Sequence, residues 1–328
     1  MRPFAYERAP DPDAAVSSAQ THAAEGVRYL AGGTNLVDLM RLGVERPGHL
    51  IDVTRLGNDR IEETDDGGLR IGAAVSNAEV AAHDLVCRDH PLLADALLHG
   101  ASGQLRNLAT VGGNLLQRTR CSYFQDVTKP CNKRRPGSGC PAREGAHRNL
   151  AILGHSEACV ATHPSDMAVA MAALDAVVHV TGPNGDRVIP MPGFHRLPGD
   201  EPQRDTLLEP AELITDVMLP PPITGARSRY RKVRERSSFA FALVSVAAVL
   251  AVEDGLVSEI RIALGGVAHV PWRAERAEDE LLGEPAGEEA FAAAADAELE
   301  SARPLRDNVY KVALAHNLIV RTLAELCP

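Results

Sequence analysis

The apolar and polar residues of the first 100 positions switch repeatedly between helical and strand-like spacing. Apolar residues three or four positions apart predict a helix, and short apolar or alternating runs predict a strand. The patterns predict, in order, a helix over 13–24 that Gly26 ends, a strand over 27–31, a helix from Asn35 to Arg41, strands over 49–53 and 69–73, and short helices that begin at Asn77 and Pro91. The chain is therefore expected to begin as a mixture of helices and sheet.

Residues 100–150 follow neither pattern and are rich in glycine, proline and basic residues. An irregular segment of this length is usually functional or disordered. After it, Ser165 caps a predicted helix over 166–175, and strands are expected over 176–181 and 187–189.

A proline run at 220–222 marks the expected end of the first folding unit. Beyond it, strands are predicted over 228–234, 242–253 and 257–264, with a turn at Asp254-Gly255 between the last two. Helices are predicted near 272–282, 288–300 and 307–326. This second part is expected to form a small antiparallel sheet with helices on one side.

The composition opposes several classes of function. Of the 328 residues, 45% are hydrophobic and 24% are charged, as in ordinary globular proteins. The net charge of −10 and the aromatic content of 4% oppose binding to nucleic acid or to an anionic membrane. No apolar run is long enough to be inserted in a membrane, and the first residues lack the apolar stretch of a secretory signal, so we expect the chain to fold in the cytoplasm.

Positive charge gathers in one segment of this acidic chain. Residues 118–148 contain eight Lys or Arg and two acidic residues, a local excess of six positive charges. Three of the six cysteines lie in the same segment. The combination fits either a zinc-supported nucleic-acid module or positive charge around an anionic metal–thiolate centre.

Two glycine pairs are candidate anion-binding corners. They lie in the segments Leu30-Ala31-Gly32-Gly33-Thr34-Asn35-Leu36 and Ala109-Thr110-Val111-Gly112-Gly113-Asn114-Leu115. Glycines at a turn before a helix expose backbone N–H groups, which bind anions such as a pyrophosphate. Neither segment matches the Rossmann or the Walker A pattern, and a simple tight turn remains the alternative for each.

Four of the six cysteines, Cys121, Cys131, Cys140 and Cys159, fall within 39 residues in the pattern C-x9-C-x8-C-x18-C. Disulfides are not expected in a large chain that folds in the cytoplasm. The pattern lacks the short knuckle usual for zinc, and four thiolates from long loops suit a cubane iron–sulfur cluster at least as well. Spacing alone leaves a cluster, a zinc site and unrelated buried cysteines open. The other two cysteines, Cys87 and Cys327, are expected to be packing residues.

The segment His163-Pro164-Ser165-Asp166 contains the residue types of a catalytic triad. Helix capping explains Ser165 and Asp166 without catalysis, and no G-x-S-x-G motif supports a nucleophile. At the start of its helix, Asp166 is also placed to accept a hydrogen bond from a ligand hydroxyl group.

Taken together, these segments resemble a known family. AGGTNL, followed about 75 residues later by NLATVGGNL, is similar to the paired signature of the FAD-binding medium subunits of the xanthine dehydrogenase and carbon monoxide dehydrogenase group. The segments QRTRCSYFQ, PCNKRRPGSGCPA and SEACVATHPSDMAVAMAALDA resemble the branch found in bacterial periplasmic aldehyde oxidoreductases, which carries an additional 4Fe–4S cluster. The resemblance spans essentially the whole chain.

The resemblance implies an α+β fold in two domains. Residues 1–222 would form a two-subdomain FAD-binding fold of the vanillyl-alcohol-oxidase (PCMH) type, with a 4Fe–4S-binding insert at about 118–160. Residues 223–328 would form a CO dehydrogenase flavoprotein-like C-terminal domain, which is the sheet with helices predicted above.

The resemblance also implies which residues bind the cofactors. Noncovalent FAD would contact Leu30, Ala31, Gly32, Gly33, Thr34, Asn35, Leu36, Thr110, Gly113, Asn114, Ser165, Asp166, Ile189 and Lys232, the last in YRKVRERSSFA. The cluster would be ligated by Cys121, Cys131, Cys140 and Cys159. Lys133, Arg134 and Arg135 would then stabilise the negative charge of the cluster or dock an acidic partner.

The implied protein is an electron-transfer subunit of an oxidoreductase complex. A large molybdopterin-binding subunit would oxidise an aldehyde, a small subunit with 2Fe–2S clusters would relay the electrons, and FAD would pass them to an external acceptor. No residue of this chain would then be a catalytic acid or base. A stand-alone flavoprotein oxidase with the same fold and a zinc-stabilised nucleic-acid-binding protein are the alternatives. Co-export with a small subunit that bears a twin-arginine signal would bring the complex to the periplasm.

Overall fold

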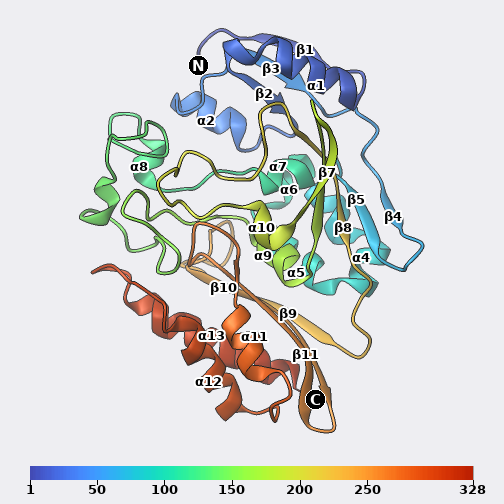
Figure 1. The fold of residues 1–328 in the computed structure, drawn as a ribbon, viewed down its shortest axis with the longest axis vertical. Helices are drawn as coiled ribbons and strands as arrows, with labels where there is room; N and C mark the ends of the chain where they lie inside the picture. The colour runs from blue at the N-terminus through green and yellow to red at the C-terminus, as the bar shows by residue number, and fades with distance from the viewer. Residues whose placement is uncertain (328) are drawn as a thin grey trace.

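The computed structural model describes residues 1–327, which form three sheets with helices packed between and around them (Figure 1). The first sheet is parallel and has the strand order β1-β3-β2. Its strands are β1 (Ala5–Arg8), β2 (Val27–Leu30) and β3 (His49–Asp52), and the short helices beside it are α1 (Pro12–Thr21), η1 (Ala23–Glu25) and α2 (Leu36–Leu42). Asp11 begins α1, since its side chain accepts a hydrogen bond from the N–H of Ala14 at 2.8 Å.

The second sheet is antiparallel, with the strand order β4-β5-β8-β6-β7. Its strands are β4 (Ile61–Glu63), β5 (Leu69–Gly72), β6 (Val177–Gly182), β7 (Gly185–Pro190) and β8 (Leu213–Leu219). Most of the remaining helices of this part lie between β5 and β6 in the sequence: α3 (Asn77–Ala82), α4 (Asp84–Asp89), α5 (Pro91–His99), α6 (Gly103–Leu108), α7 (Val111–Leu115) and α9 (Asp166–Ala173), while α10 (Met191–Phe194) follows β7. All eight residues of α9 are buried, which makes it the central helix of the molecule.

The third sheet, antiparallel in the order β12-β11-β10-β9, lies between two layers of helices. It consists of β9 (Arg227–Val233), β10 (Val244–Glu253), β11 (Leu256–Gly265) and β12 (Trp272–Arg273). One face packs against α11 (Glu275–Leu281), α12 (Glu288–Leu299) and α13 (Tyr310–Leu326), and the other contacts α5 and α9 (Figure 1). The expectation that the helices of the C-terminal part lie on one side of its sheet is therefore confirmed, and α5 and α9 of the first part cover the other face.

An irregular insert joins α7 to α9 and contains only α8 (Ser122–Gln125) and η2 (Pro141–Arg143). Two buried side chains near the start of α13 attach the later part of this insert to the C-terminal helices. Asn308 donates to the carbonyl oxygens of Leu150 and Ala151 at 3.2 Å, and the ammonium group of Lys311 donates to that of Leu150 at 3.1 Å. The insert is thus held by the rest of the molecule, although it has little secondary structure.

The structure confirms the mixed helix-and-sheet fold, with a few differences in the elements. The Asp254-Gly255 turn is confirmed: both residues have positive φ angles, 51° and 82°, as a tight hairpin between β10 and β11 requires. Four strands were not predicted, namely β1, β4, β8 and β12. The predicted helix near 272–282 begins only at Glu275, because Trp272 and Arg273 pair with β11 as β12.

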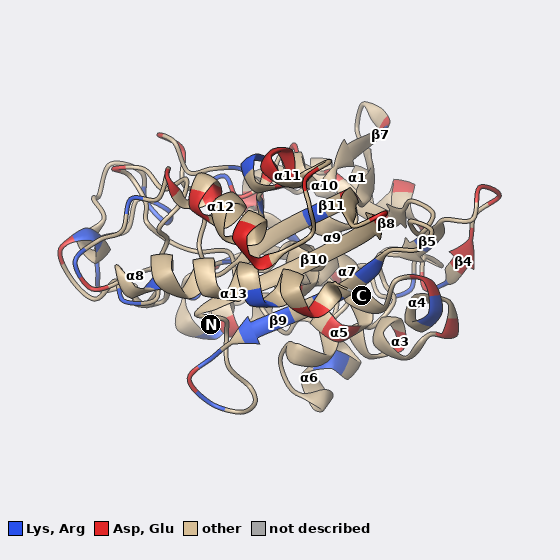
Figure 2. Ribbon diagram, turned by 90° about the horizontal axis from the view of Figure 1, so that it is seen from below, with Lys and Arg blue, Asp and Glu red and all other residues tan. Residues whose placement is uncertain are grey.

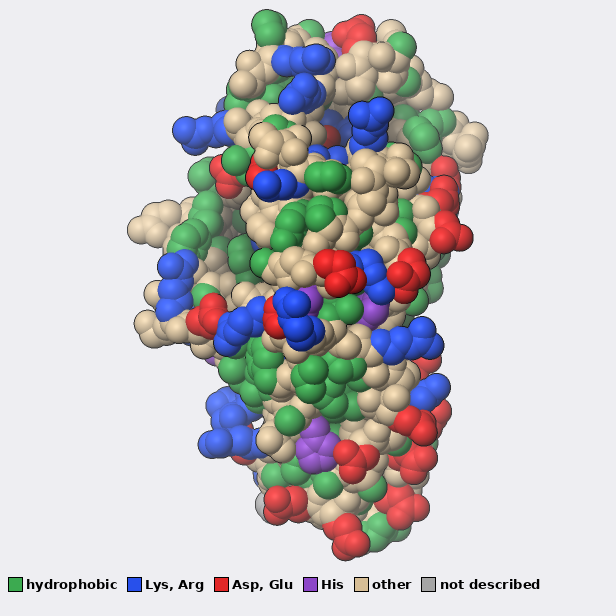
Figure 3. All heavy atoms as spheres, turned by 90° about the vertical axis from the view of Figure 1, so that its left-hand side faces the viewer, with side chains coloured by type: hydrophobic (Ala, Val, Ile, Leu, Met, Phe, Trp, Pro, Cys, Tyr) green, Lys and Arg blue, Asp and Glu red, His purple; other side chains and the backbone are tan. Residues whose placement is uncertain are grey.

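Charged residues are unevenly distributed over the surface. Strand β9 carries Arg227, Arg229, Arg231 and Lys232 and is the most prominently basic strand in Figure 2. Seen from the side of the insert, Lys and Arg are scattered over the upper part of the molecule, and acidic side chains gather at the lower end (Figure 3). Within residues 1–327, no helix combines the length and the apolar character needed to cross a membrane.

Candidate functional site

A cavity of about 680 Å³, here called the central cavity, lies where both glycine segments meet the start of α9 and the loop between β9 and β10. The predicted site residues in its wall are Thr34, Asn35, Gly113, Asn114, Ser165, Asp166 and Lys232. The structure therefore brings together residues that are up to 198 positions apart in the sequence.

A second cavity of about 250 Å³, here called the N-terminal cavity, lies between the first glycine segment and the strand ends of the first sheet. Its wall includes the predicted residues Ala31, Gly32, Gly33, Thr34, Asn35, Leu36, Thr110 and Gly113. Thr34, Asn35 and Gly113 line both cavities. The two cavities thus adjoin at the glycine corners, as an elongated ligand with a central pyrophosphate would require.

The first glycine corner needs glycine for two separate reasons. Gly33 has a φ of 71°, a left-handed conformation that side chains disfavour. At Gly32, a methyl group would overlap the carbonyl oxygen of Leu108 at the end of α6. Asn35 accepts a hydrogen bond from the N–H of Arg118 at 2.9 Å, while its buried Nδ2 has no hydrogen-bond partner among the described residues. A buried donor without a partner, in a residue that lines both cavities, fits a site that a polar ligand fills.

The second glycine corner is a short helix start. Thr110 caps α7 by accepting a hydrogen bond from the N–H of Gly113 at 3.2 Å. Asn114 accepts a hydrogen bond from the hydroxyl group of Ser165 at 2.6 Å, which ties this corner to the start of α9. Both glycines here have ordinary negative φ angles.

Asp166 and Lys232 form a buried ion pair in the wall of the central cavity. Their side chains are 8% and 1% exposed, and the Lys232 Nζ lies 2.7 Å from Asp166 Oδ2. Tyr230 donates its hydroxyl group to the other oxygen, Asp166 Oδ1, at 2.6 Å. Burial and the Asp166 carboxylate raise the pKa of Tyr230 well above its ordinary value. Asp166 is therefore an oriented carboxylate that two donors already hold.

The role of Tyr230 was missed at the sequence level, although the sequence held a signal. Residues two apart on a strand point to the same face, so Tyr230 and Lys232 share a face of β9. Other lining residues that sequence reasoning missed come from α3, α6 and the β9–β10 loop, namely Asn77, Arg106, Phe239 and Phe241.

Two predicted residues do not reach either cavity wall as the structure describes it. Ile189 is a buried residue of β7, paired with Val178 in the main hydrophobic core. Leu30 ends β2 and packs beside Gly33. The capping role of Ser165 is also visible, because its hydroxyl oxygen accepts a hydrogen bond from the N–H of Ala168 at 2.9 Å.

The four clustered cysteines line one small cavity in the insert, here called the cysteine pocket. Cys121 and Cys159 are buried, and Cys131 and Cys140 are half-buried. The free volume of the pocket is about 10 Å³, which is room for about one water molecule. Cys121 also belongs to the wall of the central cavity. The other two cysteines lie elsewhere, Cys87 on α4 and Cys327 after α13.

The arrangement of the sulfurs bears on which metal would suit the pocket. In a tetrahedral zinc site, four sulfurs at about 2.3 Å from the metal lie about 3.8 Å from one another. Within the described part of the chain, no three cysteine sulfurs lie within 4.8 Å of one another. A cubane cluster separates its thiolates more widely, since each thiolate binds a different iron. The cysteine sulfurs are therefore not gathered as closely as a tetrahedral zinc site would hold them.

Burial raises the pKa of Cys121, Cys140 and Cys159, so the free thiols are protonated. Backbone N–H groups act in the opposite direction, including those of Phe124 on Cys121 and Ala161 on Cys159. Such N–H groups stabilise thiolates once a metal has displaced their protons.

The basic residues of the insert mostly have partners inside the molecule. Lys133 is buried, lines the cysteine pocket and forms an ion pair with Asp205. Arg134 donates to the carbonyl oxygens of Tyr123 and Phe124. Of the three residues proposed to dock an acidic partner, only Arg135 is exposed. Lys133 therefore lies beside the four cysteines and away from the surface, while Arg134 is half-buried and holds loop carbonyl groups of the insert.

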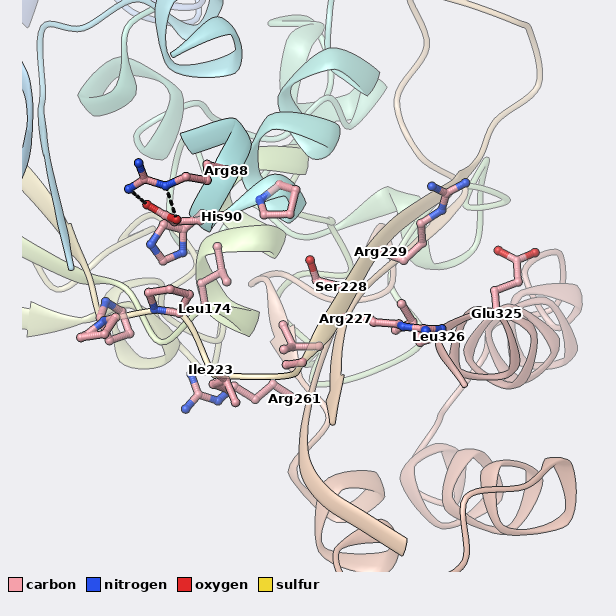
Figure 4. A pocket seen from close by; sticks show the side chains of 17 residues that line it. Arg88, His90, Leu174, Ile223, Arg227, Ser228, Arg229, Arg261, Glu325 and Leu326 are labelled. Atoms are coloured by element: carbon pink, nitrogen blue, oxygen red, sulfur yellow. Dashed lines mark hydrogen bonds and ion pairs between the residues drawn. The ribbon is translucent and has the colours of Figure 1, made fainter. Parts of the chain in front are cut away.

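A third cavity, also of about 680 Å³, contains none of the predicted site residues (Figure 4). It lies between the proline run at 220–222 and the start of β9, and four arginines line it, Arg88, Arg227, Arg229 and Arg261. Arg88 forms an ion pair with Asp89 at 2.6 Å and Arg261 one with Asp175 at 2.9 Å. Internal partners thus account for half of its positive charge.

Comparisons with known proteins assign the chain to a family. Residues 2–222 match the family model described as the FAD-binding domain in molybdopterin dehydrogenase, and residues 228–326 match the CO dehydrogenase flavoprotein C-terminal domain. The chain is 54% identical to the aldehyde oxidoreductase FAD-binding subunit PaoB of Escherichia coli over 99% of this chain and 98% of that protein. It is 30% identical to the carbon monoxide dehydrogenase medium chain of Hydrogenophaga pseudoflava over 90% of this chain and 88% of that protein.

Solved structures give the same result for the fold. Carbon monoxide dehydrogenase from Hydrogenophaga pseudoflava superimposes with a TM-score of 0.78 at 28% identity, covering 99% of this chain and 97% of that one. Quinoline 2-oxidoreductase from Pseudomonas putida superimposes with a TM-score of 0.75 at 23% identity, which shows the shared fold.

Proposed function

Because this chain belongs to the family of FAD-binding subunits of molybdenum hydroxylases, we propose that it carries both FAD and a 4Fe–4S cluster and passes electrons from partner subunits to an external acceptor. The observation that carries the proposal is Cys121, which lies in the wall of both the cysteine pocket and the central cavity. A cluster bound there would lie directly beside the FAD.

The residues present fit FAD. The pyrophosphate would lie at the glycine corners between the two cavities, near the unpartnered Asn35 Nδ2. The flavin ring would occupy the central cavity near Lys232, and the adenosine part the N-terminal cavity. When bound, FAD supplies the ability to accept electrons singly and to release them singly or in pairs.

The residues present also fit an iron–sulfur cluster, with one condition. The four sulfurs converge from separate loops, and backbone N–H groups and Lys133 surround the pocket. The pocket has room for the centres of water-sized spheres over only about 10 Å³, so we expect the surrounding loops to adjust when a cluster binds. Cluster binding would therefore be coupled to ordering of the insert.

The proposed assembly contains a large molybdopterin-binding subunit and a small subunit with 2Fe–2S clusters, and the substrate is an aldehyde. The 54% identity to an aldehyde oxidoreductase subunit over nearly the whole chain supports this assignment. The chain would fold in the cytoplasm and reach the periplasm only with an exported small subunit. The proposed domain division places the boundary at residue 222, between β8 of the second sheet and β9 of the third.

The test is an absorbance spectrum combined with activity. We expect the purified chain to show flavin bands on a broad iron–sulfur background, and to oxidise aldehydes only after its two partners are added. A colourless protein, or an isolated chain as active as the complex, would contradict the proposal.

Acid precipitation distinguishes the stand-alone oxidase, in which a covalent flavin is frequent. We expect the acid to release the flavin into the supernatant, because the FAD is proposed to be noncovalent. Flavin retained in the pellet would instead indicate a covalent bond.

A further inference from the structure

Four ionisable side chains meet near the start of β3, the central strand of the first sheet. They are Glu7 on β1, His22 at the end of α1, Glu25 on η1 and His49 at the start of β3. Strand β2 runs parallel to β3 from Val27 to Leu30, and the first glycine corner follows its far end. The group therefore lies at the opposite end of this sheet from the proposed FAD site and includes none of the cluster cysteines.

His49 is the central member of the group, and its ring is unsatisfied. Its side chain is 7% exposed, and neither ring nitrogen has a hydrogen-bond partner among residues 1–327. Its Nε2 lies 3.4 Å from Glu7 Oε1, and its Nδ1 lies 3.8 Å from Glu25 Oε2. Buried polar atoms usually have a partner, so an imidazole with two unpaired nitrogens between two carboxylates indicates a place where a ligand or ion binds.

His22 supplies a second imidazole to the same place. Its ring stacks on that of His49, with 3.9 Å between the ring centroids and 19° between the planes. Its Nδ1 lies 2.9 Å from Glu25 Oε1, which leaves Nε2 as its free nitrogen. Glu25 thus faces the Nδ1 atom of both histidines, the position of a carboxylate that orients metal-binding imidazoles.

We propose that Glu7, His22 and His49 bind a divalent transition-metal ion, with Glu25 orienting the two histidines. One potential ligand atom from each of the three residues lies within 4.8 Å of the others. Bonds of about 2.1 Å to a tetrahedral metal place two ligand atoms about 3.4 Å apart, the distance observed between His49 Nε2 and Glu7 Oε1. Two imidazoles and one carboxylate suit zinc, cobalt, nickel or copper, whereas magnesium and calcium prefer oxygen ligands.

Metal binding requires one local movement. Two stacked rings cannot both direct a lone pair at one ion, so one ring must tilt out of the stack. His22 is the ring that moves, because its side chain is 30% exposed, whereas burial fixes His49. Glu7 is already held by the hydroxyl group of Ser18. The ion would join β1, the end of α1 and β3, and so hold this helix against the first sheet.

The test is a cobalt titration of the untagged protein with its FAD and cluster bound. We expect one equivalent of Co²⁺ to bind with weak visible bands and without the intense sulfur-to-cobalt bands that cysteine ligation would give. Zn²⁺ should displace it. His49→Ala, His22→Ala and Glu7→Gln should each weaken cobalt binding at least tenfold. The control is His316→Ala, which removes the histidine of an isolated His316–Asp296 pair on the C-terminal helices. This control should bind cobalt as tightly as the wild type.

Stability gives a second measurement in case His49→Ala folds poorly. Zn²⁺ should raise the Tm of the wild type and of His316→Ala, because both keep the proposed site. It should leave the Tm of His22→Ala unchanged, because that variant lacks one ligand. His22→Ala is suitable for this comparison because His22 is partly exposed and can be replaced without opening the core. Unchanged cobalt affinity in both His22→Ala and Glu7→Gln, or no saturation at millimolar cobalt in the wild type, would overturn the proposal.

Discussion

The central cavity and the cysteine pocket share Cys121 but are built differently. The central cavity has about 680 Å³ of open space, and helix starts and strand ends that belong to the packed core form much of its wall. The cysteine pocket has about 10 Å³, and the loops around it have little secondary structure. Packed helices and strands therefore shape the central cavity before any ligand binds, whereas the cysteine pocket depends on four side chains from an irregular insert.

This difference separates two modes of cofactor binding. A preformed cavity can take up FAD after folding, and removing FAD should leave the fold intact. If the proposed cluster binds in the narrow cysteine pocket, the free energy of metal binding would also stabilise the folded insert. Removing the cluster should therefore loosen the insert, although a small apolar group that includes Phe124, Leu150 and Val160 will retain part of its structure.

The largest effect is expected from Cys131→Ser. Replacing one of the four thiolate ligands should remove most of the iron and make the insert sensitive to proteases, while FAD remains bound. Iron analysis and limited proteolysis measure both effects. Cys87→Ser on α4 is the matched control and should leave the iron content unchanged. Full iron in Cys131→Ser, or zinc in the wild type, would contradict the ligand assignment.

A large effect is also expected from Asp166→Ala, in the wall of the preformed site. The substitution leaves the ammonium group of Lys232 buried without its counter-charge, which typically costs about 3–5 kcal/mol of unfolding free energy. Chemical denaturation measures the loss. Asp89→Ala breaks the solvent-screened pair with Arg88 and should cost far less stability than Asp166→Ala. Similar losses in the two variants would show that Asp166 is not a buried partner.

Gly32→Ala tests the preformed corner itself. The added methyl group overlaps the carbonyl oxygen of Leu108, so the backbone must shift at a cost of about 1–3 kcal/mol. We expect at least tenfold weaker FAD binding and unchanged iron, measured by flavin fluorescence and iron analysis. Gly103→Ala, where a methyl group meets open space, is the control and should bind FAD normally. Normal FAD affinity in Gly32→Ala would place the cofactor elsewhere.

The smallest effect is expected from Thr110→Ala. Losing the cap of α7 should cost about 1 kcal/mol of stability, because the N–H of Gly113 loses its partner. FAD affinity should fall by less than it does in Gly32→Ala, since the backbone of the second corner is unstrained. A loss of FAD as large as that of Gly32→Ala would mean that the two corners contribute equally.

The sequence predicts the regular elements better than the contacts between them. The hairpin of β10 and β11 was predictable because Asp254-Gly255 is a strong local turn signal. Strand β8 was missed because it follows an irregular stretch and is defined by its neighbours β5 and β6, which are distant in sequence. Helices α6 and α7 have six and five residues, too few for a helical period to appear.

The candidate site shows the same limit. The glycine corners and the capping Ser165 were recognisable from local patterns, but the hydrogen bond from Tyr230 to Asp166 spans 64 positions. The convergence of the four cysteines was likewise not deducible from their spacing, since long-range packing of the insert brings them together. The buried partners of Lys133 and Arg134 could not be foreseen, because Asp205 and the carbonyl groups are reached only in the folded insert.

The most direct test of the account is whether the flavin and the cluster are neighbours. Electron paramagnetic resonance of the partly reduced protein measures this, because a nearby paramagnetic cluster speeds the spin relaxation of the flavin radical. We predict markedly faster relaxation in the wild type and in Cys87→Ser than in Cys131→Ser. Equal relaxation in all three proteins, with iron present in the wild type, would contradict the shared wall at Cys121.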